Sequence, residues 1–585
     1  MRYRWVEPDA SDWATEAGGE ALLRALLTRR GLTAPEAIDA FLRPHPSALA
    51  DPFGMADMGR AVDRLAAAHR RRELVAIHGD YDVDGLTSTA LLTRALRGMG
   101  FAVQPYVPHR VRDGYGLRTE TIDRLAHEGA ALLIAVDCGI SNRAEVAHAR
   151  ALGVDVVVLD HHQVPESLPE AAAVVNPRRA DCPYAYKDLA AVGLAYALVR
   201  ALVAEGYSLG GRWQEDEGDL LDLLELVALG TVADVAPLTG ENRVLVAWGL
   251  QSLRHTGHPG LRALCEVAGL EPARLTAWHI GYVLGPRLNA AGRIGEPEVA
   301  LRLLLTESPG EAADLARQLD RLNRDRQREM ARIIAEATAR VEAIGPVDDG
   351  RPLIQLDGEG WTAGVVGLVA GRLTERYSRP VLILERGDGE SRGSARSIDG
   401  FNIVEALAEC GDLLRHYGGH AKAAGLTVAN EHLESLHARL LELATARLSA
   451  EQLRPTLRLD LALPATLAAL SPATADTLAR LEPCGHGNPE PLLLLRDVAV
   501  RWPRTFGDGK HLSFSIPFGP RQGMRAVAFG QGDREGEVRR ARKVDLAGSL
   551  RRDWWQGEER LEFHVRDFRS AARGPVTRLQ AASAE

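Results

Sequence analysis

Residues 78–85 read HGDYDVDG, and they follow directly on a short apolar run, LVAI, at residues 74–77. A short apolar run of this kind is typical of a buried strand in a parallel sheet. In open α/β sheets, ligands bind beyond the carboxyl ends of the strands. The stretch therefore predicts a strand that delivers one imidazole and three carboxylates to a binding site.

The chain around this stretch alternates strand-like and helix-like patterns. Apolar runs at residues 131–136 and 154–159 are further strand candidates, and residues 87–98 form a helical stretch between the first two strands. Strands that alternate with helices indicate βαβ units and a doubly wound parallel sheet. We therefore expect residues 51–260 to form an α/β domain with its ligand site at one edge of the sheet.

Polar residues follow the other two predicted strands as well. Asp137 follows one of them, and Asp160, His161 and His162 follow the other; a fourth segment, GTVAD, ends in Asp234. Like charges gathered at one crevice repel strongly, and divalent cations relieve that repulsion. A site rich in carboxylate with some imidazole suits Mn²⁺ or Mg²⁺ better than Zn²⁺. Six or more ligands at one crevice imply two ions, the usual arrangement for hydrolysis of a phosphate ester.

Each segment has a simpler interpretation when it is taken alone. A single aspartate at a strand end, such as Asp137 or Asp234, is more often a helix cap or a turn residue. A pair of histidines is more often a polar surface feature. HGDYDVDG is also similar to the start of a calcium-binding loop, but the twelfth position of that loop needs a glutamate, and this chain has Leu91 there.

The four segments, in this order and spacing, resemble the DHH phosphoesterase superfamily. The resemblance implies that Asp137 bridges two ions, that His162 faces the scissile phosphate and that Asp160 orients an imidazole. Asp80 either binds an ion or hydrogen-bonds water near one. The implied metal-binding set is His78, Asp80, Asp82, Asp84, Asp137, His161 and Asp234. The implied catalytic set is Asp82, Asp84, Asp137, Asp160, His161, His162 and Asp234.

Downstream segments extend the resemblance to the RecJ family of this superfamily, over residues 1 to about 570. GGHAKAAG at residues 418–425 is similar to the glycine-rich motif of DHHA1 domains, although alone it would indicate a tight turn. Glycine lets the backbone approach a phosphate closely, and arginine matches phosphate oxygens bidentately. The candidates for binding DNA phosphates are Arg110, Arg287, Asn289, Arg293, Ser394, Arg396, Gly419 and His420. Any one arginine alone is more often a surface or ion-pair residue.

The rest of the chain divides by pattern. A charged helical pattern over residues 308–344 indicates a spacer helix between domains, with a coiled-coil helix as the alternative. Five or six β-like runs near the carboxyl end fit a small β-barrel of the OB type. The expected parts are an N-terminal helical extension (1–50), the DHH domain (51–260), a connector with the spacer helix (261–345), a DHHA1 α/β domain (346–450), the OB domain (451–575) and a tail (576–585).

The predicted barrel is a candidate platform for single-stranded DNA. Residues 501–573 carry sixteen Lys or Arg against ten Asp or Glu, a net charge of +6, although the whole chain has a formal net charge of −9. Aromatic rings stack with bases while cations follow the backbone. The candidates are Arg501, Lys510, Arg551, Trp554 and Trp555. An ordinary solvated surface is the alternative, and we expect Phe514 in the barrel core.

The composition is that of an ordinary globular protein: of 585 residues, 46% are hydrophobic and 25% are charged. Five widely spaced cysteines argue against a disulfide framework and favour the cytoplasm. We expect neither a membrane span nor a signal peptide, because we find no run of about 18 apolar residues and no apolar segment at the N-terminus. Cys484 and His486 have no further Cys or His nearby, so we expect a turn there rather than a metal site.

The resemblance implies a single-stranded-DNA-specific exonuclease that digests from 5′ to 3′, releases 5′-mononucleotides and serves DNA repair and recombination. It also implies a helicase and a single-strand-binding protein as partners, and we expect a monomer. One alternative is another DHH phosphodiesterase, such as a nanoRNase, a pAp phosphatase or a cyclic-dinucleotide phosphodiesterase, which generally lack the OB domain. A second is a non-catalytic, Cdc45-like relative, but all of the expected metal ligands are present here.

Overall fold

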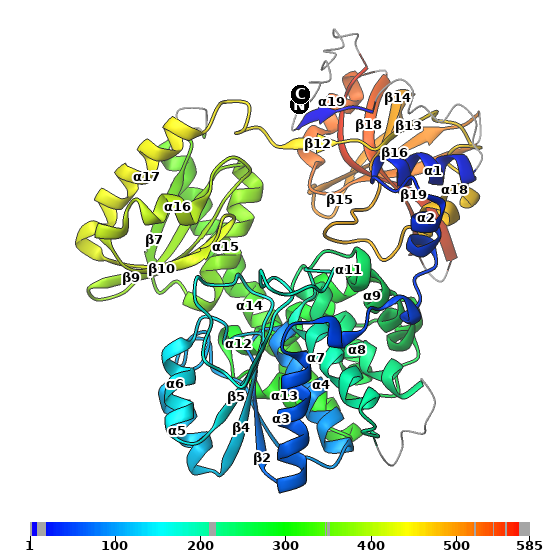
Figure 1. Cartoon of the computed structure of the whole chain (residues 1–585). Helices are drawn as coiled ribbons and strands as arrows, with labels where there is room; N and C mark the ends of the chain where they lie inside the picture. The colour runs from blue at the N-terminus through cyan, green and yellow to red at the C-terminus, as the bar shows by residue number, and fades with distance from the viewer. Residues whose placement is uncertain are drawn as a thin grey trace, which may run out of the picture. The chain divides into compact units, whose positions relative to one another are not determined.

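The computed structural model describes residues 3–8, 19–209, 218–345, 347, 351–519, 522–541, 543–555 and 558–571 (Figure 1). The chain divides into two compact units. We call residues 43–453 and 483–488 the α/β unit, and residues 1–42, 454–482 and 489–585 the β unit. Within the described ranges, no helix is long and apolar enough to cross a membrane.

A five-stranded sheet lies at the centre of the first half of the α/β unit. Its order is β3-β2-β4-β5-β6, and every neighbouring pair is parallel. The strands are β2 (Leu74–His78), β3 (Ala102–Tyr106), β4 (Ala130–Val136), β5 (Asp155–Leu159) and β6 (Ala173–Val175). From β2 the chain first adds β3 on one side and then β4 on the other. Open sheets bind their ligands at the carboxyl ends of the strands beside such a reversal.

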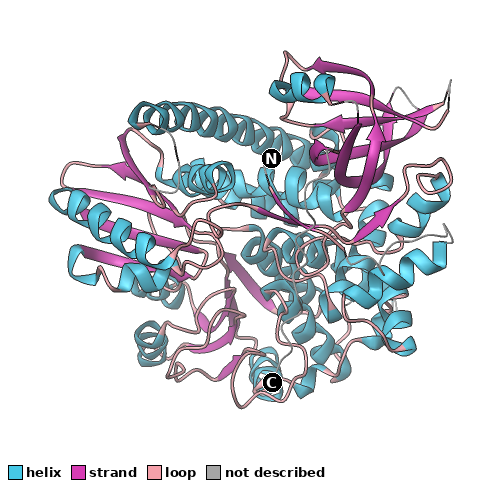
Figure 2. Ribbon diagram, turned by 90° about the horizontal axis from the view of Figure 1, so that it is seen from above, coloured by secondary structure: helices cyan, strands magenta, loops and turns pink. Residues whose placement is uncertain are grey.

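Helices cover both faces of this sheet (Figures 1 and 2). Successive strand residues face opposite sides, so Val75 and Ile77 enter one core while Ala76 enters the other. Helices α3, α4, α7 and α8 pack on the first side, and α5 and α6 pack on the second. The bounds are α3 (Met58–Arg71), α4 (Val83–Gly98), α5 (Thr119–His127), α6 (Arg143–Ala151), α7 (Ala191–Ala204), α8 (Gly218–Ala233), α9 (Gly240–Arg254) and α10 (Pro259–Val267).

The predicted long helix is confirmed as α14 (Pro309–Ile344), which has 36 residues. Ser308 caps its start, where the Ser308 hydroxyl accepts a hydrogen bond from the Glu311 amide. The first half of α14 places Leu315 and Leu319 in the core of the first sheet, and the second half places Ile333 in the core of a second sheet. Three short segments precede it: α11 (Ala277–His279) with a π-helical turn (Ile280–Leu284), α12 (Gly285–Ile294) and α13 (Glu298–Leu305).

The second sheet of the α/β unit has the order β10-β11-β9-β8-β7. Only β7 and β8 are parallel; the other neighbours are antiparallel. The strands are β7 (Ile354–Glu359), β8 (Val381–Arg386), β9 (Glu390–Arg396), β10 (Leu414–His420) and β11 (Ala423–Ala429), and the helices are α15 (Ala363–Tyr377), α16 (Ile403–Ala408) and α17 (Leu433–Arg447). The glycine-rich residues 418–425 form the hairpin of β10 and β11.

The β unit contains a seven-stranded sheet of order β13-β14-β18-β19-β17-β16-β15, where five or six strands were expected. Strands β14 and β15 each contain an irregularity: Asp497 in β14 and Trp502 in β15 adopt left-handed φ values, and the register shifts beside each of them. The strands are β13 (Leu461–Leu463), β14 (Leu493–Ala499), β15 (Arg501–Phe506), β16 (His511–Pro517), β17 (Gly523–Ala528), β18 (Lys543–Trp555) and β19 (Glu558–Ser570).

The N-terminal extension is part of the β unit. It contains helices α1 (Gly19–Arg29) and α2 (Pro35–Leu42), but it begins with a strand, β1 (Arg4–Val6). Strand β1 pairs in parallel with β12 (Thr456–Arg458), and the Trp5 indole donates a hydrogen bond to Asp567 at 2.8 Å. The two predicted α/β parts, the long helix and the β-rich domain are thus all present in the expected order.

Candidate metal centre and nucleic-acid-binding surfaces

Four segments that are far apart in the sequence meet at the carboxyl edge of the first sheet. They are the end of β2 with the start of α4, the residue after β4, the residues after β5 and the residue after α8. Three sets of side chains each place their candidate ligand atoms within 4.8 Å of one another: Asp80, Asp82 and Asp137; Asp84, His161 and Asp234; and Asp137, His161 and His162. Asp137 and His161 belong to two sets each, the arrangement expected where neighbouring ions share ligands.

Asp137 sits in a backbone conformation that is uncommon for its residue type. Its φ is 63°, in the left-handed region, and its amide donates a hydrogen bond to the Leu159 carbonyl at 3.0 Å. Such conformations persist only where the surroundings hold them, and they cluster at functional sites. The hydrogen bond to β5 therefore fixes the turn that presents the Asp137 carboxylate beside His161.

Helix α4 holds the carboxylates of the first motif in fixed positions. The Asp82 carboxylate caps the helix by accepting hydrogen bonds from the amides of Asp84 at 2.9 Å and Gly85 at 3.1 Å. The Asp84 carboxylate accepts hydrogen bonds from the amides of Ala191 and Val192 at 2.7 and 2.9 Å. Gly85 must be glycine, because a Cβ there would lie 2.4 Å from the Asp80 amide nitrogen.

Burial gives these groups unusual protonation. Burial, and after it the charges of neighbouring aspartates, raises the pKa of Asp84 to about 7 and the pKa of Asp234 to about 8, and raises the pKa of Asp137 well above its ordinary value. Burial lowers the pKa of His78 to about 4 and, together with His162, lowers the pKa of His161 to about 3. Neutral imidazole is the form that binds a metal ion, and a cation would relieve the crowding of the carboxylates.

The hydrogen bonding of the cluster also fits bound cations. His78 Nε2, Asp80 Oδ1, Asp137 Oδ1 and His161 Nε2 are buried, and none has a hydrogen-bond partner among the described residues. His161 Nε2 and Asp137 Oδ1 are 3.2 Å apart, but their alignment does not make a hydrogen bond. Buried polar atoms are normally satisfied. Four such atoms in one place, all of ligand type, therefore fit divalent cations.

Asp160 and His162 form a hydrogen-bonded pair at the edge of this cluster. His162 Nδ1 lies 2.8 Å from the Asp160 carboxylate and 3.1 Å from the Tyr115 hydroxyl. Burial acts against a charge on His162, but the hydrogen bond and charge of Asp160 raise the pKa of His162 to about 9. Burial alone would raise the pKa of Asp160, but His162 and the Ile140 amide bring it below its ordinary value. His162 is thus a positively charged donor beside the cluster at neutral pH.

Three of the predicted phosphate-binding arginines lie close together near Asp82. Burial, and then the neighbouring guanidinium groups of Arg110 and Arg326, lower the pKa of Arg293 to about 9. Burial and Arg110 also lower the pKa of Arg396. The Arg110 guanidinium lies 4.0 Å from the Tyr81 ring centroid, and its buried Nε has no hydrogen-bond partner among the described residues. Guanidinium groups that repel one another in this way favour an anion between them.

Ser394, Arg287 and Asn289, which are also predicted to bind phosphate, differ in their surroundings. A Cβ on Gly367 of α15 would lie 3.1 Å from Ser394 Oγ and 3.2 Å from an Arg396 nitrogen, so both side chains point to this glycine. Arg287 is instead held by Asp320 at 3.1 Å. Asn289 of α12 is half-buried, and its buried Oδ1 has no hydrogen-bond partner within the described residues.

Gly419 and His420 lie in the β10–β11 hairpin. Gly419 has a φ of 144°, and a Cβ there would lie 2.3 Å from the Ala423 carbonyl oxygen, so only glycine fits. The His420 ring stacks parallel to the His162 ring, with 6.3 Å between centroids and 14° between planes. His420 of the second sheet therefore faces the cluster on the first sheet.

Three family models match the chain in the predicted order. The DHH family N-terminal domain matches residues 74–231, the DHHA1 domain matches residues 350–449 and the RecJ OB domain matches residues 460–567. The first range contains all of the metal-binding candidates except Asp234. The second contains the glycine-rich hairpin.

Curated relatives match over nearly the whole chain. The single-stranded-DNA-specific exonuclease RecJ of Dickeya dadantii is 38% identical and covers 93% of this chain and 95% of the relative. RecJ of Bacillus subtilis is 35% identical and covers 93% of this chain and 67% of the relative. The chain belongs to the RecJ family. The crystal structure of Thermus thermophilus RecJ with Mn²⁺ is 33% identical, has a TM-score of 0.80 and covers 97% of this chain and 80% of that one. The same RecJ with Mg²⁺ gives a TM-score of 0.75 at 32% identity.

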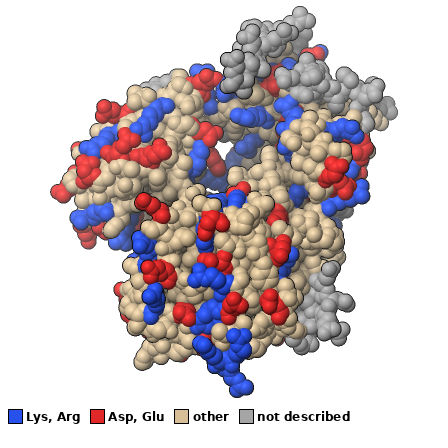
Figure 3. Space-filling view, viewed as in Figure 1, with Lys and Arg blue, Asp and Glu red and all other residues tan. Residues whose placement is uncertain are grey.

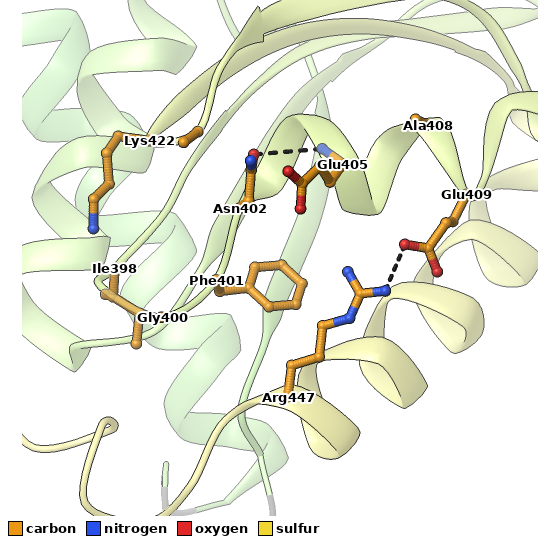
Figure 4. A pocket seen from close by; sticks show the side chains of 10 residues that line it. Ile398, Gly400, Phe401, Asn402, Glu405, Ala408, Glu409, Lys422 and Arg447 are labelled. Atoms are coloured by element: carbon orange, nitrogen blue, oxygen red, sulfur yellow. Dashed lines mark hydrogen bonds and ion pairs between the residues drawn. The ribbon is translucent and has the colours of Figure 1, made fainter. Parts of the chain in front are cut away.

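Surface charge on one face and one surface depression of the α/β unit can be described. On the face shown in Figure 3, basic and acidic side chains are mixed over the α/β unit. An open depression of about 760 Å³ lies in the DHHA1 part, where Figure 4 shows Arg447 directed toward Glu409 and Asn402 toward Glu405. Lys422 at its edge pairs with Asp399. Because these charged groups already have partners within the protein, we assign no ligand to the depression.

The part of this chain that matches the RecJ OB domain contains a compact group of four rings. Phe506, His511, Phe529 and His564 come from four neighbouring strands or their ends, and their ring centroids are 5.1 to 6.2 Å apart in successive pairs. We call these four residues the aromatic face. Phe529 is 55% exposed, and the Arg525 guanidinium lies 5.8 Å from the Phe506 ring. Arg525 also pairs with Glu562 at 2.8 Å. An exposed ring such as Phe529 has the chemistry that stacks on unpaired bases.

The residues predicted for this surface are more scattered. Arg551 pairs with Glu490, Arg501 donates a hydrogen bond to the Gly519 carbonyl, and Lys510 is exposed at a turn. Trp554 and Trp555 end β18, but their side chains lie outside the described part of the structure, as does the tail at 576–585. Phe514 is buried, as expected for a core residue.

The sequence interpretation missed His511, Phe529 and His564. Each is a single ring without a local motif, and the available signal was weak: Phe506 and Phe529 each directly precede a glycine at a strand end. The turn expected around Cys484 and His486 is present, since the amides of Gly485 and Asn488 each donate to the carbonyl of the other.

Proposed function

We propose that this protein is a single-stranded-DNA-specific exonuclease that hydrolyses phosphodiester bonds from the 5′ end and releases 5′-mononucleotides in DNA repair and recombination. The observation that carries the proposal is the convergence of Asp82, Asp84, Asp137, His161 and Asp234 in a chain that is similar over nearly its full length to RecJ exonucleases. The buried His78 ends the strand that leads into this cluster. The OB domain favours a long DNA substrate over the dinucleotides that other DHH phosphodiesterases use.

The metal-binding set holds two divalent ions, Mn²⁺ or Mg²⁺, in this proposal. Bound there, the ions would supply Lewis-acid charge to the phosphodiester. Asp137 would be a ligand common to both ions, because it shares one candidate ligand set with Asp80 and Asp82 and another with His161 and His162. Asp80 has a buried oxygen without a partner, which favours direct binding to an ion over a supporting role.

His162 contacts the substrate in this proposal, and Asp160 positions it. The Asp160 carboxylate accepts the proton of His162 Nδ1, so the charged ring can donate from Nε2 to an oxygen of the scissile phosphate. The Tyr115 hydroxyl lies against the same ring nitrogen and donates a hydrogen bond to the Asp137 carbonyl. This arrangement favours the phosphate over a neutral substrate group.

Arg110, Arg293, Arg396 and Ser394 bind DNA phosphates in this proposal, together with Asn289, Gly419 and His420. The mutual repulsion of the three guanidinium groups next to Asp82 supports an anion at this position. Arg287 was predicted for the same task, and its ion pair with Asp320 suits it better to holding α12 against α14. In the β unit, Arg501, Lys510, Arg551, Trp554 and Trp555 remain proposed DNA-binding residues.

Further parts of the proposal rest on the family resemblance. We propose domain boundaries at 51–260 for DHH, 346–450 for DHHA1 and 451–575 for OB. Each of these ranges contains the range that the corresponding family model matches, and the first also includes Asp234. A helicase and a single-strand-binding protein are the proposed partners, and the protein is proposed to be monomeric. None of its five cysteines, all within the described residues, forms a disulfide, which supports a cytoplasmic location.

One comparison of substrates tests the function. The full chain with Mn²⁺ is given a 5′-phosphorylated 30-mer, the same 30-mer as a blunt duplex, and a mixture of dinucleotides. We expect mononucleotides from the single strand, with label lost first from the 5′ end, and little product from the duplex. Hydrolysis of the dinucleotides with no attack on the 30-mer would identify another DHH phosphodiesterase and defeat the proposal.

A further inference from the structure

Asp234, one of the metal-binding candidates, directly follows α8 and stands at the start of a strained turn. The Ala236 amide donates a hydrogen bond to the Thr231 carbonyl at 3.2 Å. The Val235 amide donates one to the Val232 carbonyl, also at 3.2 Å. These two bonds form a Schellman motif, in which the residue after the helix cap is left-handed and is usually glycine. In this chain that residue is Val235, with a φ of 62°.

The conformation of Val235 needs support from its surroundings. A β-branched residue in the left-handed region is an outlier, and such conformations persist only where the neighbouring structure holds them. The Val235 side chain is 62% exposed, so its own packing contributes little. The next four residues, 236–239, are better placed to hold the turn, because Ala236 and Leu238 are buried. We call these four residues the support loop.

One set of contacts to the support loop comes from nearby parts of the chain. The Pro237 carbonyl accepts a hydrogen bond from the Asn242 side-chain amide at 3.0 Å. The Tyr186 hydroxyl lies 3.2 Å from the same carbonyl and 2.8 Å from the Thr239 carbonyl. Asn242 is in the first turn of α9, so this helix anchors the loop from its own end.

A second partner of the support loop is the turn at residues 483–488, which we call the clamp turn. It is closed by its own hydrogen bonds, since the amides of Gly485 and Asn488 each donate to the carbonyl of the other. The Asn488 side chain is buried, and its amide donates to the Pro483 carbonyl at 2.8 Å. The chain on both sides belongs to the β unit, whereas the clamp turn belongs to the α/β unit. The carboxyl-terminal part of the chain thus supplies a preformed element to the α/β unit.

The backbone of the clamp turn lies directly against the support loop. The Leu238 amide donates a hydrogen bond to the His486 carbonyl at 2.7 Å. A Cβ on Gly487 would lie 3.0 Å from Pro237 Cβ, and a Cβ on Gly485 would lie 2.7 Å from Leu238 Cδ1. Gly487 also has a φ of 71°. The approach is therefore close enough that glycine is needed at both positions.

We propose that the clamp turn is a positioning element for Asp234. By fixing the support loop, it holds the strained turn at Val235 and so holds the Asp234 carboxylate where one ion can share it with Asp84 and His161. The inference rests on the proposed function. Contacts that orient a metal ligand typically change metal affinity by about 10- to 100-fold when they are lost. The carboxyl-terminal part of the chain would then contribute to metal binding without supplying a ligand.

The test measures binding of Mn²⁺ alone to the full chain by isothermal titration calorimetry. Gly487→Ala places a methyl group against Pro237. Gly487→Asn places the same Cβ there but tolerates the left-handed conformation better, so it separates the contact from backbone strain. The matched control is Gly153→Ala, because Gly153 has a φ of 79° and a Cβ there would meet no described atom within 4 Å. Asn488→Ala, which opens the clamp turn from within, is a second variant.

We expect the Mn²⁺ Kd of one binding event to rise by about tenfold or more in both Gly487 variants. The affected event is the one that uses Asp234, and the other should change less. Asn488→Ala should shift the same event, and Gly153→Ala should bind Mn²⁺ as the wild type does. The Mn²⁺ concentration for half-maximal cleavage of a single-stranded 30-mer should rise by the same factor. Saturating Mn²⁺ should restore kcat, and KM for the strand should stay unchanged.

Three outcomes would overturn the inference. One is an unchanged Mn²⁺ affinity in the Gly487 variants. Another is a loss in Gly487→Ala that Gly487→Asn restores or that Gly153→Ala shares, which would assign the effect to backbone strain. The third is a fall in kcat that saturating Mn²⁺ does not restore. If circular dichroism shows that the Gly487 variants do not fold, Asn488→Ala decides by the same criteria. If the wild type binds no Mn²⁺, the proposed metal centre fails first, and that result is distinct from all three.

Discussion

The metal centre of the α/β unit and the aromatic face of the β unit build binding sites in opposite ways. At the metal centre, charged side chains are at least nine-tenths buried at His78, Asp84 and Asp137, and several of their atoms lack hydrogen bonds. On the aromatic face, Phe529 is more than half exposed, and its neighbours touch it ring to ring. One site concentrates strong interactions in a fixed place, and the other distributes weak ones over a surface.

This difference predicts different responses to substitution. Removing one buried ligand leaves the remaining charges uncompensated and misplaces an ion, so the loss of catalytic activity should be close to complete. Removing one exposed ring loses only its own stacking and leaves the neighbours in place. Substitutions in the two regions should therefore differ by orders of magnitude, and in different kinetic parameters.

The largest effect is expected for Asp137→Asn. The amide keeps the shape of the carboxylate but removes the charge shared by two candidate ligand sets, so kcat should fall by about a thousandfold or more. The measurement is Mn²⁺-dependent release of mononucleotides from a 5′-labelled 30-mer, with DNA binding followed by fluorescence anisotropy. Binding should persist. Cleavage at the wild-type rate would show that this cluster is not the catalytic site.

The next largest effect is expected when the metal ions are removed, and it should appear as a lower free energy of unfolding. Burial and the charges of neighbouring aspartates both raise the pKa values of Asp84, Asp137 and Asp234. Bound ions would relieve the repulsion between these carboxylates. Saturating Mn²⁺ should stabilise the chain by about 3 kcal/mol relative to EDTA, the value for a ligand at a hundred times its Kd. Thermal unfolding in both buffers gives the shift. Asp137→Asn should lose most of it, and an equal shift in that variant would contradict the shared-ligand role.

An intermediate effect is expected for Arg396→Ala. A charged hydrogen bond to phosphate contributes about 1.5–3 kcal/mol, so KM should rise by about tenfold to a hundredfold while kcat changes less. The control is Arg392→Ala on the same strand, where Arg392 is 63% exposed and pairs with Glu390. Steady-state kinetics on 5′-phosphorylated and 5′-hydroxyl 30-mers would show whether Arg396 binds the terminal phosphate, because only then would the two substrates become equal in the variant.

The smallest effect is expected on the aromatic face. Phe529→Ala should weaken binding of a 30-mer by about fivefold, since base stacking contributes about 1 kcal/mol or more per ring. Phe529→Tyr keeps the ring and should bind as the wild type does. Anisotropy at two salt concentrations is the measurement. A loss that depends strongly on salt would mean that the residue acts through neighbouring cations rather than through stacking.

The clustering of the candidate metal ligands could be predicted from the sequence because most of them follow short apolar strands. In a parallel sheet, the carboxyl ends of β2, β4 and β5 lie at one edge, so the order of the segments already places Asp82, Asp137 and His161 together. Asp234 was less accessible to this reasoning, because it follows a helix rather than a strand and only the family motif marked it.

The binding surfaces were harder to predict because their residues carry no local pattern. Phe529 and His564 meet only because β17 and β19 pair in parallel across about 35 intervening residues. The ion pair of Arg287 with Asp320 likewise depends on how α12 packs on α14.

Helix α14 sets the distance between the two halves of the α/β unit, because its side chains are embedded in both cores. A single residue inserted near its middle would rotate one half against the other by about 100° and lengthen the rod by about 1.5 Å. His420 and Arg396 would then no longer meet the first sheet at the right place. The length of this one segment is therefore as tightly constrained as any metal ligand, although none of its residues needs to touch the substrate.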